Sequence, residues 1–255
     1  MMTGVLLATV AGSTIFFGLM LARWRGASER LRAVLALVSA GVVLFLVVDV
    51  GHQAVAAVEV TVHRDLVSVA LQRGLLFVCG FGAGLIGLAW FEGRRLRNHA
   101  IKKGALEVAT IIATGIGLHN FALGLAIGQS FAGGELSLGA PLLVGFAPHN
   151  TTEGFGIAGL LVGQNVSWRQ LFSLGLIAGA PTVFGAALGG MWVSPAVELL
   201  CLSIATGSLI YVVRELLRMR SHTLGAVAQM TAIALGFLLG FIAELIVGSA
   251  YAYGD

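Results

Sequence analysis

The sequence has few charged residues. Asp, Glu, Lys and Arg make up 11% of its 255 residues, against about 25% in soluble globular domains. Hydrophobic residues make up 58%, so the composition excludes an ordinary soluble domain, a disordered chain, a collagen and a nucleic-acid-binding protein. It predicts a polytopic α-helical membrane protein with one integral membrane domain, residues 1–255.

Cysteine is also scarce. Cys79 and Cys201 are the two cysteines, and each lies in an apolar stretch without a neighbouring Cys or His. This spacing excludes a disulfide framework and a zinc knuckle.

Long polar segments are missing, and apolar stretches about as long as a bilayer-spanning helix follow one another closely. We predict an all-α fold of eight transmembrane helices, at approximately 4–22, 33–56, 70–91, 105–130, 139–163, 170–192, 196–217 and 223–250. The first stretch resembles a signal peptide, but its first basic residues, Arg23 and Arg25, follow it. We therefore expect a true span.

The basic residues predict the orientation. Thirteen of the fifteen Lys and Arg residues fall in the odd-numbered loops, and Arg64 and Arg73 are the exceptions. Because cytoplasmic loops are rich in Lys and Arg, we expect both termini to be extracytoplasmic. We expect the protein itself to lie in the inner membrane of a prokaryotic cell.

Glycines recur four residues apart within several spans, as at 124 and 128, 159 and 163, 185 and 189, and 236 and 240. Small residues at this spacing allow helices to approach closely in lipid. We expect most of them to serve helix packing.

Ionisable residues within spans are costly and are candidates for function. The sequence has nine of them, namely Asp49, His52, Glu107, His119, His149, Glu153, Glu198, Glu215 and Glu244. Glu107 and Glu198 lie near helix starts, where an acid complements the helix dipole, so we expect structural roles for these two.

His119, His149 and Glu153 lie near the middle of the fourth and fifth spans. His149 and Glu153 are four residues apart and share a helix face. Imidazole and carboxylate together suit zinc or a similar transition ion. Pro148 should disturb the backbone hydrogen bonding of its helix, and broken helices at midplane are common in transporter sites.

The two spans also share the pattern His-Asn-x-x-x-Gly, as HNFALG at 119–124 and HNTTEG at 149–154. Since neighbouring spans run in opposite directions, each presents His and Asn at similar depth. This repetition favours a shared site. The alternative is a pair of core histidines whose hydrogen bonds are satisfied by each other or by Glu153.

These motifs resemble those of the ZIP (Zrt/Irt-like) divalent metal transporters. The third span, GFGAGLIGLAWFEGRRLRNH, and the seventh, GSLIYVVRELL, are also similar to family segments. Glu215 falls at a family ligand position, and Asp49 falls where many members carry a His.

The resemblance implies transport of a divalent transition metal toward the cytoplasm by an elevator-like movement, with zinc as the first candidate and iron or manganese as others. It implies that His119, His149 and Glu153 are ligands and that Asn120 and Asn150 line an adjacent second site. Asp49, His52 and Glu215 are candidates for the ion path. The implied partners are the metal ion, the lipid bilayer and a second copy in a homodimer. Neither an organic cofactor nor enzymatic activity is expected.

The chain departs from the family at Leu123 and Ala180, where members commonly carry acids. Two ions beside Glu153 alone would leave about three uncompensated positive charges in a low-dielectric setting. We therefore predict a single-ion site, completed by water or an Asn oxygen in tetrahedral geometry.

Two alternatives stay open. One is an intramembrane zinc-dependent hydrolase, although the sequence contains no HExxH motif. The other is a ZIP-fold protein that carries another solute or senses metal.

Overall fold

The computed structural model describes residues 2–62, 67–96, 104–132, 139–191, 194–218 and 224–252. These residues form helices and short connections, and no strand occurs among them. In chain order the described elements are α1 (Met2–Ser13), α2 (Ile15–Leu19), the 3-10 turn η1 (Met20–Arg23), α3 (Glu29–Val62), α4 (Val67–Leu96), α5 (Ala105–Ala132), α6 (Gly139–Ala158), α7 (Trp168–Gly189), α8 (Pro195–Arg218) and α9 (Ala226–Ala252).

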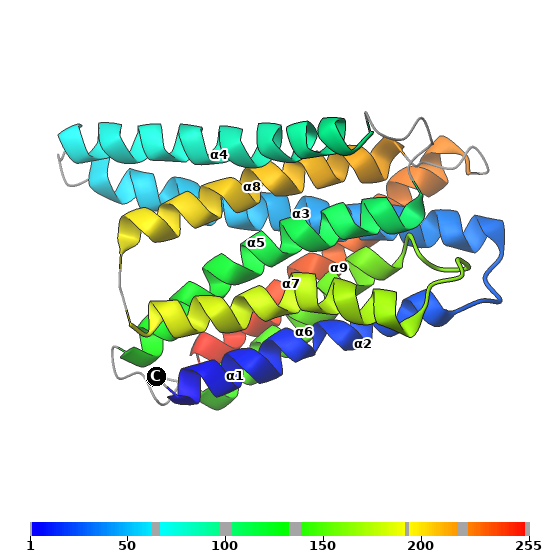
Figure 1. The fold of residues 1–255 in the computed structure, drawn as a ribbon, viewed down its shortest axis with the longest axis horizontal. Coiled ribbons are helices and arrows are strands. Elements are labelled where there is room, and N and C mark those ends of the chain that lie inside the picture. The colour runs from blue at the N-terminus through cyan, green and yellow to red at the C-terminus, as the bar shows by residue number, and fades with distance from the viewer. Residues whose placement is uncertain are drawn as a thin grey trace.

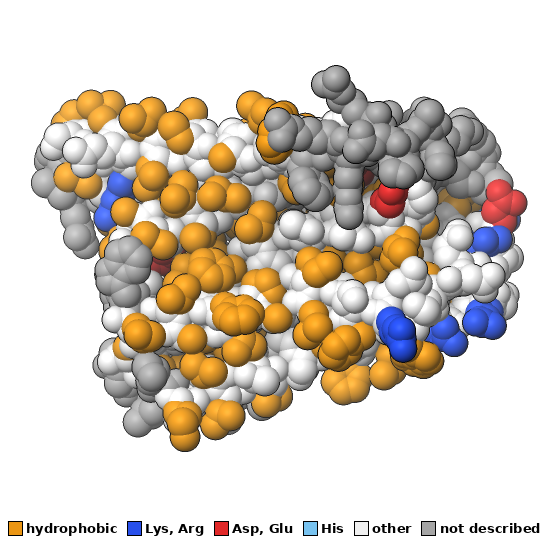
Figure 2. Space-filling model, in the orientation of Figure 1, with side chains coloured by type: hydrophobic (Ala, Val, Ile, Leu, Met, Phe, Trp, Pro, Cys, Tyr) orange, Lys and Arg blue, Asp and Glu red, His pale blue; other side chains and the backbone are white. Residues whose placement is uncertain are grey.

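The described helices include seven stretches long and apolar enough to cross a membrane. They are Met2–Arg23, Glu29–Thr61, Val67–Trp90, Ala105–Gln129, Trp168–Gly189, Pro195–Leu217 and Ala226–Ile246. Large apolar side chains cover much of the surface (Figure 2), as expected for contact with lipid. The prediction of an all-α protein with membrane-crossing helices is therefore confirmed in these terms.

The predicted fifth span corresponds to α6, which is not among those seven stretches. Its second half carries Pro148, His149, Asn150 and Glu153, which make it much less apolar than its neighbours. The count of eight spans therefore stays a prediction.

The helices form two bundles. The first bundle consists of α1, α2, α5, α6 and α7, and the second consists of α3, α4, α8 and α9. Figure 1 shows α4, α8 and α3 on one side of the molecule and α1, α2 and α7 on the other, with α5 between them. The bundles meet where α5 packs on α8 and α6 packs on α9 and α3.

Glycines bring helix backbones together within each bundle. A Cβ at Gly124 or Gly154 would collide with the carbonyl oxygen of Thr182 or Ile15 in the first bundle. Between the bundles, a Cβ at Gly156 would meet Val43 Cγ2 at 3.7 Å, an ordinary van der Waals contact. At Gly159, just past the end of α6, a Cβ would collide with the Leu35 carbonyl oxygen and Ser39 Oγ of α3. Glycines therefore allow close approach both inside the bundles and at one point between them.

The predicted fifth span is too long at its end. The sequence predicts a span at approximately 139–163, but α6 ends at Ala158 and turns follow to residue 163. Gly163 has a φ of 77°, a left-handed conformation that glycine adopts without steric cost. Its N–H donates to the Trp24 carbonyl at 3.2 Å. Gly159 and Gly163 therefore do not form a helix face.

One expectation about helix continuity, the break at Pro148, is wrong. The first span, Met2–Arg23, contains a turn at Thr14 between α1 and α2, where both the N–H and the Oγ1 hydroxyl donate to the Ala11 carbonyl. By contrast, α6 continues through Pro148 without a break. The chain interruption near the site is thus in the first span rather than in α6.

Several basic residues that entered the orientation prediction, together with Asp65, His99 and His222, lie outside the described residues. The basic ones are Arg64, Arg97, Lys102, Lys103 and Arg220.

Candidate metal centre

Three buried side chains from two helices of the first bundle converge on one point. His119 lies on α5, and His149 and Glu153 lie one turn apart on α6. His119 Nε2 lies 3.4 Å from His149 Nε2 and 3.5 Å from Glu153 Oε1, and His149 Nε2 lies 3.4 Å from the same Oε1. We call these three residues the ligand triad.

The dimensions of the ligand triad fit a tetrahedral metal ion. Zinc lies about 2.0–2.2 Å from nitrogen and oxygen ligands. Tetrahedral geometry then separates neighbouring ligand atoms by about 3.3–3.6 Å, and all three observed separations fall in this range. Within the described residues these atoms form a group of His and acidic ligands close enough to share one ion.

The same atoms are poorly satisfied without an ion. Their separations exceed the usual 2.7–3.2 Å of a protein hydrogen bond. Glu153 Oε1 and His119 Nδ1 are buried and have no hydrogen-bond partner. The side chains of His119, His149 and Glu153 are 3%, 5% and 0% exposed. This arrangement favours a ligand role over a pair of satisfied core histidines.

The two asparagines hold the site in place. Asn120 Nδ2 donates to Glu153 Oε2 at 2.7 Å and to the Ala178 carbonyl on α7 at 3.1 Å. Asn150 Nδ2 donates at 2.7 Å to the Ala11 carbonyl, beside the Thr14 break. Both Oδ1 atoms are buried without a hydrogen-bond partner, so they are candidates for the predicted Asn oxygen ligand.

Thr182 on α7 was not singled out from the sequence. Its Oγ1 is also buried without a hydrogen-bond partner. One threonine in a long apolar span gives no distinctive pattern, and only the packing of α7 against α1 and α5 makes its burial visible.

The second bundle adds acids beside the ligand triad. Glu244 Oε2, on α9, lies 3.4 Å from His149 Nδ1, the ring nitrogen on the far side from Glu153. Asp49, on α3, interacts electrostatically with Glu244, His149 and His52, and its Oδ2 accepts a hydrogen bond from Gln53. The sequence identified Glu244 as an ionisable residue within a span but gave it no partner.

The other predicted path residues lie apart from the ligand triad. Glu215, on α8, is buried and accepts a hydrogen bond from Arg214 Nη1 at 2.6 Å. His52 is exposed, one turn beyond Asp49. Glu107 and Glu198 lie in the first turns of α5 and α8, as the dipole argument predicted.

At the position of the missing acid, Leu123 packs against an apolar cluster of α1, α5 and α6 that includes Ala11, Ile127 and Phe146. Ala180 is half-buried on α7, just before Pro181. Neither position offers a ligand atom to an ion.

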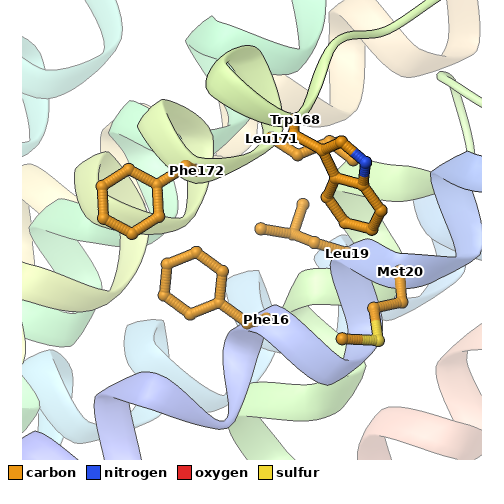
Figure 3. Close-up of a pocket in the computed structure, with 6 residues that line it drawn as sticks. All are labelled: Phe16, Leu19, Met20, Trp168, Leu171 and Phe172. Carbon is orange, nitrogen blue, oxygen red and sulfur yellow. The ribbon is translucent and has the colours of Figure 1, made fainter.

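Figure 3 shows an apolar groove of about 220 Å³ between α2, η1 and α7. Its lining residues are Phe16, Leu19, Met20, Trp168, Leu171 and Phe172. The groove shares no residue with the ligand triad and contains no His, Cys or acidic side chain, so it offers none of the usual ligands for a transition metal.

In comparisons with known proteins, no protein-family model and no curated protein matches this chain. The resemblance to ZIP transporters therefore stays an expectation from sequence motifs.

Proposed function

We propose that this protein carries a divalent transition metal ion, with zinc first and iron or manganese as alternatives, across a membrane toward the cytoplasm. The observation that carries the proposal is the ligand triad, whose three ligand-atom separations of 3.4–3.5 Å match the edge of a tetrahedral metal site. A buried ion-binding group within apolar helices is expected in a carrier.

We propose eight spans, with α6 as the fifth and both ends of the chain outside. In support, the start of α1 and the end of α9 lie at the same end of the molecule (Figure 1), as an even number of crossings requires. Arg and Lys side chains gather mainly at the opposite end (Figure 2), where η1 ends and α3 and α7 begin.

We further propose alternating access by movement of the first bundle against the second. All three members of the ligand triad and both asparagines belong to the first bundle. At the boundary between the bundles, a Cβ at Gly156 would make only ordinary van der Waals contact with Val43, although Gly159 approaches the α3 backbone closely at Leu35. A bundle that holds the whole ligand set can carry the ion as it shifts.

The site suits one ion. Two neutral imidazoles and the Glu153 carboxylate leave a divalent ion with a net charge of about +1, which predicts moderate affinity and allows release. A second ion would require another carboxylate on the first bundle, where Leu123 and Ala180 supply none, since Glu244 and Asp49 belong to the second bundle.

The test is zinc uptake by vesicles that contain the purified protein. Glu153→Gln removes the carboxylate charge and His149→Ala removes an imidazole, so each should reduce uptake at least tenfold. Glu198→Gln is the matched control, because this acid lies in the first turn of α8 outside the ligand triad. Unchanged uptake in both triad variants would exclude this site.

The same preparation separates the alternatives. A sensor would bind zinc at the ligand triad without moving it, and a carrier of another solute would not bind transition metals at all. A hydrolase would cleave peptide or lipid substrates in a chelator-sensitive manner. Zinc uptake that depends on Glu153 favours the carrier over all three. Gel filtration with light scattering tests the expected homodimer.

A further inference from the structure

Glu244 contacts the ligand triad from the other bundle. It is the one acid of α9, and its Oε2 lies 3.4 Å from His149 Nδ1. His149 Nε2 faces Glu153 and His119. The imidazole of His149 therefore lies between two bundles, with one nitrogen directed to each.

This placement selects the form of the imidazole that binds metal. A neutral imidazole has one N–H and one nitrogen lone pair. When the proton is on Nδ1, 3.4 Å from the Glu244 carboxylate, Nε2 carries the lone pair and faces the ion position. A carboxylate behind a ligating histidine fixes its tautomer and ring orientation and raises its basicity.

Glu244 also supplies negative charge that the first bundle lacks. An ion at the ligand triad keeps a net charge of about +1. Leu123 and Ala180 contribute no charge, and the nearest further acids that interact with His149 are Glu244 and Asp49, both on the second bundle. Glu244 touches the imidazole, whereas Asp49 acts on it at longer range.

We infer that Glu244 is a positioning residue for His149 that also compensates the charge of the bound ion from the opposing bundle. The inference rests on the proposed metal transport. The contact exists only while α6 and α9 keep the present register, so a shift of the first bundle would separate His149 from Glu244. The ion is then held more tightly in the present arrangement than after the shift, which favours its release.

The experiment measures zinc affinity of the purified full-length protein by calorimetry, together with uptake by vesicles. Glu244→Ala removes both the hydrogen-bond acceptor and the charge, and we expect the Kd for zinc to rise about 10- to 100-fold. Glu244→Gln keeps an acceptor oxygen of the same reach, so its Kd should lie between those of the wild type and Glu244→Ala. Glu198→Gln, the matched acid outside the site, should stay within about twofold.

Two further measurements separate positioning from general stability. In uptake, Glu244→Ala should raise KM by more than it lowers the maximal rate. With Co²⁺ in place of zinc, its visible absorption bands should change in Glu244→Ala, because the orientation of a ligand ring alters the ligand field. A role in folding alone would leave the bound Co²⁺ spectrum unchanged. If Glu244→Ala fails to accumulate, the nearly isosteric Glu244→Gln carries the test.

The two hypotheses fail in different ways. If the wild type binds no zinc, or if Glu153→Gln binds it as tightly as the wild type, the proposed function is wrong. If Glu153→Gln loses affinity while Glu244→Ala keeps the wild-type Kd and Co²⁺ spectrum, only the role of Glu244 is wrong.

Discussion

The two bundles differ in what they contribute to the site. The first bundle supplies the three ligand atoms, both asparagines and the Ala11 carbonyl that holds Asn150. The second supplies Glu244 and Asp49, which act on the site electrostatically. On the proposed function, this difference is a division of roles, in which one bundle binds the ion and the other adjusts its affinity.

Burial differs between single helices rather than between the bundles, since α3 and α8 are 61% and 56% buried and the first span and α7 are each 44%. In α5, which carries His119, 67% of the most apolar stretch is buried, against 11% in α4 of the second bundle. An outer helix such as α4 is free to face lipid or a second copy. A helix enclosed by its neighbours can keep His119 and Asn120 away from lipid and water.

The largest effect should come from joining the bundles covalently. In a background with Cys79 and Cys201 replaced by Ala, a disulfide in Val43→Cys/Gly156→Cys would link α3 to α6. A Cβ at Gly156 would lie 3.7 Å from Val43 Cγ2, so the side chains at these two positions are in contact. Oxidation should abolish zinc uptake, and reduction should restore it.

The control for this cross-link lies within the second bundle. A Cβ at Gly51 would approach Thr206 Cγ2 at 3.4 Å, so Gly51→Cys/Thr206→Cys joins α3 to α8 at a similar side-chain contact. Uptake should survive its oxidation. Equal loss of uptake in both pairs, or survival in both, would argue against movement between the bundles.

A smaller effect, on protein stability, should distinguish a glycine packed closely within a bundle from one at the contact between bundles. A Cβ at Gly128 would collide with the Ala186 carbonyl on α7, so Gly128→Ala should destabilise the protein by about 1–3 kcal/mol. Gly156→Ala has room for its methyl group and gains helix propensity, so its stability should be unchanged or slightly higher. Thermal unfolding in detergent measures both, and a lower melting temperature for Gly156→Ala alone would reverse the assignment.

The positions of most helices could be predicted from the sequence. Apolar stretches predicted the helices, with ends usually within a few residues, because exclusion from water dominates such segments. The end of α6 was misplaced because the buried turns at 159–163 are as apolar as a helix. The break at Thr14 depends on hydrogen bonds that compete with the helix, and residue type alone does not reveal them.

The ligand triad was also predictable, since His149 and Glu153 share a helix face and the His-Asn-x-x-x-Gly pattern repeats at His119. The contact between Glu244 and His149 could not be predicted. Glu244 is 95 residues from His149 in the chain, and the contact arises from the register between α6 and α9. No local pattern encodes that register.

Acidification should weaken zinc binding through the first bundle. His119 and His149 can offer their Nε2 lone pairs only while these nitrogens carry no proton, so protons and zinc compete for them. The Kd for zinc should therefore rise as the pH falls from 7.5 to 5.5. Calorimetry at both pH values measures this change, and a pH-independent Kd would contradict coordination by histidine.

The smallest effect on binding is expected at Glu215. It pairs with Arg214 and lies outside the ligand triad, so Glu215→Gln should change the Kd for zinc by less than about twofold. A role in the ion path predicts a lower maximal rate of uptake at unchanged Kd. A large change in Kd would instead place Glu215 in the binding site, and wild-type uptake would remove it from the path.

The central claim is a single metal ion held by the first bundle. Anomalous diffraction from zinc-soaked crystals tests it most directly, because the map reports the number, identity and ligands of bound ions together. We predict one strong peak about 2.0–2.2 Å from His119 Nε2, His149 Nε2 and Glu153 Oε1. Two peaks at this position, a peak that omits these three atoms, or no peak would contradict the claim.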